Sequence, residues 1–270
     1  MIFVFQLERI SFQHRVYEGI DQNRKSIEIV FKKRLTKPFY WLYHSSPIRR
    51  VMRWVLLLLP FFPLSAVDFD FAVSEMIHTG ACLNRLNLCS GFCGCFSWRL
   101  NEDRIAITDS WRHKGELRFD DFLLIDFQGS LIGSARTCPE DFWIHNCLFR
   151  CFDRARAVIH THSVSAIALT RLLAGQSCLI LEGVQIPSFF HPCSHKCRLE
   201  VPIFENCQTV SALAAEIESV LRKKKHVFGF FIRGDGFYTW GWDMKEARCR
   251  AEFFERQFEA ELLLRCNCAN

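Results

Sequence analysis

The residues with the clearest chemical potential in this chain of 270 residues are two histidines, His160 and His162. They follow the apolar run 157–159, which predicts a strand that becomes polar at its end. Because side chains alternate along a strand, residues two positions apart point to the same side. Two imidazoles on one side can chelate a metal ion, and imidazole suits zinc. The alternative is a pair of partly buried histidines whose ring nitrogens are satisfied by hydrogen bonds.

A second group of possible metal ligands lies in the segment 191–197, which contains two histidines and two cysteines. Alternating imidazole and thiol ligands could hold a soft metal ion. No distant Cys-x-x-Cys pair completes the spacing of a zinc finger. We therefore favour the interpretation that 191–197 is a loop with unpaired thiols.

Helices and strands alternate in the part of the chain that follows residue 70. Apolar positions at helical spacing predict helices over 72–86, 143–152, 164–173, 210–222 and 245–264. Apolar and alternating runs predict a hairpin at 96–100 and 104–108 and strands at 122–127, 157–162, 179–181, 201–204, 226–233 and 237–241. This mixture predicts an α/β fold in which a three-layer α/β/α domain places the histidine pair at a strand end.

The composition is that of a globular protein with a mild basic excess. Half of the residues are hydrophobic, and the formal net charge is +5. Much of this excess lies before residue 55, and no basic stripe with aromatic residues follows, so we expect no nucleic-acid partner. The 14 cysteines lie largely within apolar segments. Their placement favours reduced thiols and a cytoplasmic protein over a disulfide framework.

Residues 1–67 share no pattern with the rest of the chain, and we interpret them as an N-terminal extension of a domain at 68–270. An uncharged run from Trp54 to Val67 follows three arginines within this extension. The run is too short for a membrane span, which needs ~20 residues, so we expect no membrane partner. The segment 52–66 does resemble the apolar part of a signal peptide, which is the alternative to a cytoplasmic location.

Motifs spread over about residues 72–265 follow one another in the order of a known family. The strand and turn at 157–164 are similar to its metal-binding strand, and 114–122 is similar to its KGxLxxDDF segment. Further matches are Ile107-Thr108-Asp109-Ser110, Leu173-Ala174-Gly175-Gln176, Leu181-Glu182-Gly183, Val201-Pro202-Ile203-Phe204 and Tyr238-Thr239-Trp240-Gly241. On these residues the chain resembles the class II aldolase/adducin family and, within it, the members that dehydrate a methylthio sugar phosphate.

The resemblance implies a class II aldolase-like domain whose central sheet is mixed or antiparallel. It implies a lyase that uses one zinc ion per subunit to convert 5-methylthioribulose 1-phosphate into 2,3-diketo-5-methylthiopentyl 1-phosphate in methionine salvage. The partner would be a phosphorylated sugar-like molecule, and the assembly a homo-oligomer, a tetramer by analogy. The alternatives are a zinc-dependent sugar-phosphate aldolase and a catalytically impaired, adducin-like domain.

The resemblance also implies which residues hold the metal ion. His160 and His162 match two of the family's ligands. Its third histidine lies between two glycines, where this chain has Asp235 between Gly234 and Gly236. An aspartate can ligate zinc, so a site of two histidines and one aspartate is chemically possible. The alternative for Asp235 is the ordinary role of aspartate in a tight turn.

The remaining candidate residues are one acid/base group and a set of phosphate ligands. The family's acid/base glutamate would fall at Gln185, whose amide cannot transfer a proton at neutral pH. The nearby Glu182 is therefore the candidate catalytic residue. Ser97, Ser110 and Lys114 are the candidate phosphate-binding residues.

Two other segments depart from the family pattern. The Thr-Ser-Gly-Asn phosphate loop appears as Phe92-Cys93-Gly94-Cys95, and Arg136 stands in the place of a glutamate in a Ser-Ala-Glu-Thr segment. Counting back from His160 without gaps places Asp141 at that glutamate instead. The missing glutamate at Gln185 and the altered phosphate loop support the catalytically impaired alternative, whereas the order of the motifs makes the dehydratase our first hypothesis.

Overall fold

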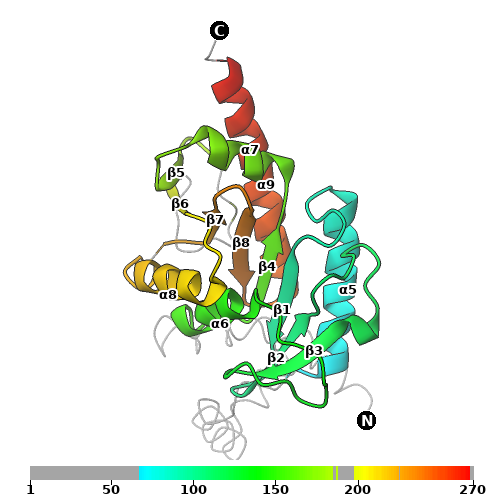
Figure 1. The fold of residues 1–270 in the computed structure, drawn as a ribbon. Coiled ribbons are helices and arrows are strands. Elements are labelled where there is room, and N and C mark those ends of the chain that lie inside the picture. The colour runs from blue at the N-terminus through cyan, green and yellow to red at the C-terminus, as the bar shows by residue number, and fades with distance from the viewer. Residues whose placement is uncertain (1–66, 185–186, 188–197, 225, 268–270) are drawn as a thin grey trace, which may run out of the picture. The chain divides into compact units, whose positions relative to one another are not determined.

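The computed structural model describes residues 67–184, 187, 198–224 and 226–267, and within them eight strands form one sheet (Figure 1). The strand order is β3-β2-β1-β4-β8-β7-β6-β5. Neighbouring strands are antiparallel except for β6 and β7, which are parallel, so the sheet is mixed. The strands are β1 Cys95–Arg99, β2 Arg104–Thr108, β3 Phe122–Asp126, β4 Ala157–Thr161, β5 Cys178–Leu181, β6 Leu199–Phe204, β7 Gly229–Ile232 and β8 Gly236–Gly241.

Helices cover both faces of this sheet, which confirms the predicted three-layer architecture. Helices α6 and α8 pack together on one face, whereas α5, α7 and α9 lie on the other (Figure 1). The helices are α5 Phe69–Arg85, η3 Phe119–Asp121, α6 Phe142–Cys151, α7 Val164–Leu172, α8 Val210–Leu221 and α9 Met244–Asn267. Among the described helices, none has the length and apolar character that a membrane crossing requires.

Strand β4 lies in the middle of the sheet, between β1 and β8. All five of its residues are buried, because helices cover the sheet on both sides of it. A strand buried on both faces is expected to be a continuous apolar run, and Ala157, Val158 and Ile159 have that character. The polar residues at the end of β4 are therefore held on a rigid, central element.

Most of the predicted elements are confirmed, including the hairpin of β1 and β2. The predicted strand at 226–233 is shorter, because β7 covers Gly229–Ile232 only. The proposed signal segment 52–66, Gln185 and the His/Cys segment 191–197 lie outside the described residues. The domain boundary between residues 67 and 68 stays a prediction.

Candidate metal centre

The end of β4 brings His160 and His162 together, as their spacing predicts. Their ring centroids lie 4.3 Å apart. His160 is paired with Cys95 of β1 and with Tyr238 of β8, so its position is fixed by strands on both sides. The main chain of His162 donates a hydrogen bond to the carbonyl of Leu88, which anchors the residue just beyond the strand.

Asp235 joins the two histidines from the turn between β7 and β8. Its Oδ2 lies 3.4 Å from His160 Nε2, and its Oδ1 lies 3.5 Å from His162 Nδ1. The next residue must be glycine, since a Cβ atom at Gly236 would lie 2.0 Å from the carbonyl oxygen of Thr161 and 2.9 Å from His160 Nε2. The turn can therefore approach the end of β4 closely enough to present its carboxylate to both rings.

These three side chains fit a metal ion. One ligand atom from each residue lies within 4.8 Å of the others. Two ligands bound about 2.1 Å from zinc at the tetrahedral angle are about 3.4 Å apart, which is close to the separations of Asp235 from the two rings. His160 Nε2 is buried, and no hydrogen-bond partner for it is found among the described residues. A metal ion would satisfy this nitrogen, because a buried polar atom otherwise carries a desolvation cost.

A second carboxylate, Asp141, approaches His160 from the opposite edge of its ring. Asp141 Oδ1 accepts a hydrogen bond from Tyr238 Oη at 2.5 Å and lies 3.2 Å from His160 Nδ1. Tyr238 also stacks on the imidazole, with 3.8 Å between ring centroids and 15° between ring planes. The sequence offers Asp141 as one of two possible matches to a family glutamate, and it predicts no role for Tyr238.

The two carboxylates and the two imidazoles set the charges of this cluster. Burial lowers the pKa of His160, but contacts with Asp141 and Asp235 outweigh it and raise the pKa to about 9. Burial and the neighbouring His160 charge lower the pKa of His162. Burial raises the pKa of Asp141 and of Asp235, yet His160 reverses this and lowers both overall. Without metal, the cluster therefore has two carboxylates and a protonated His160, and a metal ion would displace the proton from Nε2.

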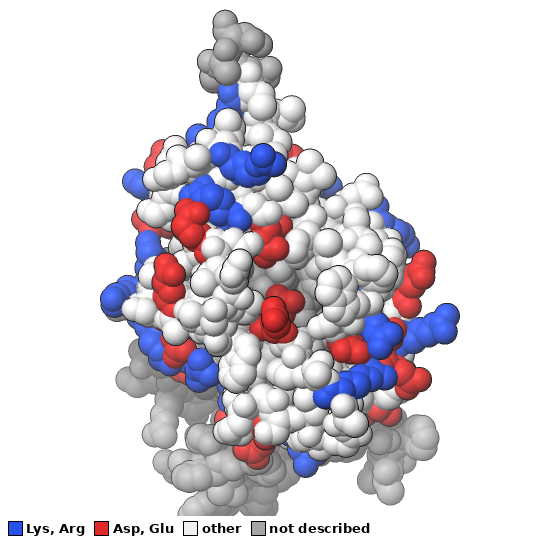
Figure 2. Space-filling view, viewed as in Figure 1, with Lys and Arg blue, Asp and Glu red and all other residues white. Residues whose placement is uncertain are grey.

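Figure 2 shows Asp and Glu side chains around a hollow near the middle of the face that is turned to the viewer, in the region of β4 and β8. Acidic groups around a hollow are suited to a cation that also contacts a small molecule. The arrangement can therefore hold a divalent ion with open positions for a ligand.

Glu182 is not brought to this cluster. It is exposed just after β5, and its Oε1 lies 3.6 Å from Arg198 Nε in a surface ion pair. Its catalytic role stays a prediction, with no contact to the metal candidates among the described residues.

The candidate phosphate residues lie on separate segments, and two of them are engaged with the protein itself. Ser97 is fully buried, and its hydroxyl lies 2.6 Å from His145 Nδ1. Lys114 is also buried, and its Nζ donates to the carbonyls of Phe92 and Arg112. Lys114 thus joins the loop at 92–95 to the segment that contains Ser110, and only Ser110 is exposed.

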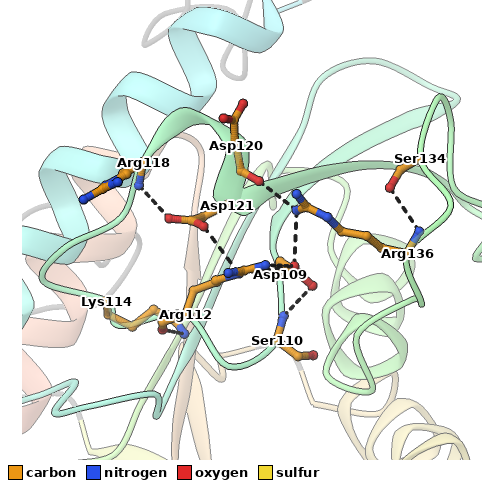
Figure 3. A network of polar contacts seen from close by, with 9 residues as sticks. All are labelled: Asp109, Ser110, Arg112, Lys114, Arg118, Asp120, Asp121, Ser134 and Arg136. Carbon is orange, nitrogen blue, oxygen red and sulfur yellow. Dashed lines mark hydrogen bonds and ion pairs between the residues drawn. The ribbon is translucent and has the colours of Figure 1, made fainter.

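The segment around Ser110 is held by a network of charged groups (Figure 3). Asp109 Oδ2 accepts hydrogen bonds from Arg112 and from Arg136, and Arg112 also pairs with Asp121. Arg136 donates a further hydrogen bond to the carbonyl of Asp120. Since each arginine is balanced by a carboxylate, we interpret the network as a support for the loop, and Arg136 as part of that support.

Comparison with known proteins agrees with the fold. A model of the class II aldolase and adducin N-terminal domain matches residues 74–262. The chain therefore belongs to the class II aldolase and adducin family. Within that family, its relatives include methylthioribulose-1-phosphate dehydratases from Pseudomonas aeruginosa and Xanthomonas oryzae pv. oryzae. The first is 37% identical over 62% of this chain and 82% of the relative, and the second is 38% identical over 63% and 75%.

Solved structures share the fold at lower sequence identity. L-fuculose-1-phosphate aldolase from Thermus thermophilus has a TM-score of 0.59 and 21% identity over 73% of this chain and 96% of its own. A sugar-phosphate aldolase from Thermotoga maritima has a TM-score of 0.55 and 16% identity over 74% and 97%. At this identity the likeness establishes the fold alone, which confirms the predicted class II aldolase-like domain.

Proposed function

We propose that this protein is a lyase that dehydrates 5-methylthioribulose 1-phosphate to 2,3-diketo-5-methylthiopentyl 1-phosphate, a step of methionine salvage. The observation that carries this proposal is the cluster of His160, His162 and Asp235 at the end of β4. It lies in a chain whose relatives at 36–38% identity are named methylthioribulose-1-phosphate dehydratases. The substrate class is therefore a phosphorylated keto sugar with a methylthio group.

The reaction removes one water molecule without any change in the total oxidation state. A base takes the proton from the carbon next to the ketone, and the hydroxyl on the following carbon leaves with a proton as water. The resulting enol then becomes the second ketone of the product. When bound, a divalent metal ion supplies Lewis-acid chemistry, which polarises ketone and hydroxyl oxygens.

Separate parts of this chain bind the metal ion, the sugar and the phosphate. His160, His162 and Asp235 would hold the metal ion, and the hollow near β4 and β8 would receive the sugar. The phosphate lies against the loops at 92–95 and 110–114, where Lys114 positions the main chain by its two carbonyl contacts. Main-chain amides of loops can bind phosphate without a charged side chain.

We further propose that the ion is zinc, with one ion per subunit, and that the protein is a cytoplasmic homo-oligomer, a tetramer by analogy with the fold. Two imidazoles and one carboxylate form a donor set that zinc accepts in catalytic sites. Elemental analysis of the purified protein measures the ion and its stoichiometry. Light scattering coupled to size exclusion measures the number of subunits.

The test is to incubate the purified, zinc-loaded protein with 5-methylthioribulose 1-phosphate and to identify the product. A diketone that the His160→Ala/His162→Ala double variant does not form supports the dehydratase. Cleavage to dihydroxyacetone phosphate and a methylthio aldehyde would identify an aldolase instead. No product from protein that contains one zinc ion per subunit would identify a catalytically impaired domain.

A further inference from the structure

Asp141 departs from the role that its position in the helix favours. It occupies the N-cap position of α6, where an aspartate side chain usually accepts a hydrogen bond from the first turn and contributes about 1 kcal/mol. Here the side chain makes no capping hydrogen bond. The first main-chain N–H groups of α6 are bonded to the carbonyls of Pro139 and Glu140 instead. The Asp141 carboxylate lies against Tyr238 and His160.

Tyr238 fixes Asp141 and His160 at the same time. It is 1% exposed and stands opposite His160 in the pairing of β4 with β8. Its ring is packed between His160 and Phe230, with 5.1 Å between the Tyr238 and Phe230 centroids. Its hydroxyl donates a hydrogen bond to Asp141 Oδ1 at 2.5 Å.

These contacts decide which nitrogen of His160 is available to a metal ion. A neutral imidazole has one nitrogen that donates and one that accepts. With Nδ1 next to the Asp141 carboxylate, the ring proton resides on Nδ1, and the lone pair is left on Nε2. Nε2 is the nitrogen that is buried without a hydrogen-bond partner among the described residues and that lies 3.4 Å from Asp235.

We propose, resting on the metal centre of the proposed function, that Asp141 and Tyr238 are positioning residues that hold His160 as an Nε2 ligand. Asp141 contacts Nδ1 at one edge of the His160 ring and so sets the tautomer. Tyr238 stacks on the face of the ring and so sets its orientation. A carboxylate behind a ligating histidine also increases the basicity of the ligand. His162 has no such support, because no described side chain forms a hydrogen bond with its ring.

The test measures the dissociation constant of zinc by competition with a chromophoric chelator, without substrate. Loss of a carboxylate behind a ligating histidine typically weakens metal binding about 10–100-fold, and we expect this for Asp141→Asn. Tyr238→Phe keeps the stacked ring and removes only the hydroxyl. It should therefore weaken zinc binding as well, but less than Asp141→Asn does. The cobalt(II) visible spectrum of each variant reports whether the ligand geometry has changed.

The matched control is Glu255→Gln. Glu255 is also a buried carboxylate beside β4, but it accepts hydrogen bonds from Thr161 and Ser163 and touches neither histidine ring. A general loss of order at the strand end would weaken zinc binding in this control as much as in Asp141→Asn. If Asp141 acts only through His160, Glu255→Gln should bind zinc with an affinity within about twofold of the native value, a difference of ~0.4 kcal/mol.

A double-mutant cycle tests whether Asp141 acts through His160. In a His160→Ala background, Asp141→Asn should cause no further loss of zinc affinity, whereas in a His162→Ala background its effect should persist. If the native protein binds zinc and Asp141→Asn binds it equally well, the positioning role is overturned and the proposed function stands. If the native protein binds no zinc, the metal centre is wrong, and both the proposed function and the positioning role fall.

Discussion

Glu255 makes the stability of the domain depend on pH. Its carboxylate lies on α9 and is 2% exposed. It accepts a hydrogen bond from Thr161 at 2.8 Å and another from Ser163, the N-cap residue of α7. Burial outweighs these hydrogen bonds and, together with the nearby Glu259 charge, raises the pKa of Glu255 to about 7.

A raised carboxyl pKa means that the folded protein binds a proton that the unfolded chain has already lost. The contribution of Glu255 to stability is therefore full below pH 4.5, the ordinary value, and is lost as the pH rises through 7. A Glu255 pKa raised from 4.5 to about 7 corresponds to about 3 kcal/mol, most of which disappears between pH 5 and pH 8. Glu255→Gln removes this titration and keeps a side chain of similar shape.

The assay is urea denaturation of the native protein and of Glu255→Gln at pH 5, 6, 7 and 8. The difference in unfolding free energy between the two should shift by about 2–3 kcal/mol in favour of the glutamine variant as the pH rises, since other titrating groups cancel in the difference. Glu216→Gln, an exposed change on α8, is the control and should give a constant difference. A constant difference for Glu255→Gln as well would show that the pKa of Glu255 is not raised by folding.

Three further predictions concern the site and its supports. Asp235→His should increase zinc affinity by about tenfold, because imidazole suits zinc better than a short carboxylate does; chelator competition measures it, and weaker binding would contradict the assignment of Asp235 as a ligand. Gly236→Ala should lower the unfolding free energy by about 3 kcal/mol in chemical denaturation, because its Cβ would overlap the carbonyl of Thr161; an unchanged midpoint would contradict the close approach of β8 to β4. Lys114→Met should lower the unfolding free energy by about 2 kcal/mol, because the Phe92 carbonyl loses its buried hydrogen-bond donor. It should also increase amide hydrogen exchange at 91–95, and unchanged exchange would mean that Lys114 does not hold this loop.

The elements and the histidine pair could be predicted from the sequence because both depend on local patterns. Period-2 and period-3.6 spacing of apolar residues predicted the strands and helices, and the spacing of two predicted that His160 and His162 share a side. The order of the strands could not be predicted in this way. Strand β4 follows β3 in the chain but pairs with β1 and β8, and such pairings depend on long-range contacts.

The contacts that hold the site in place could not be predicted from the sequence, for the same reason. Asp141 reaches His160 from the start of α6, 19 residues earlier in the chain, and Tyr238 reaches it only through the pairing of β4 with β8. The sequence does indicate that Glu255 is buried, because it lies four residues after the buried Ala251 on the same helix and therefore on the same face. A carboxylate on the apolar side of a helix needs a buried partner, and here the partners are Thr161 and Ser163.

The most direct test of the central claim is nuclear magnetic resonance of 13C-labelled 5-methylthioribulose 1-phosphate during incubation with the zinc-loaded protein. The signal of one ketone should be replaced by the signals of two adjacent ketones. This change should stop when the zinc is removed by a chelator and resume when zinc is added back. A substrate spectrum that stays unchanged with one zinc ion bound per subunit would contradict the proposed dehydration.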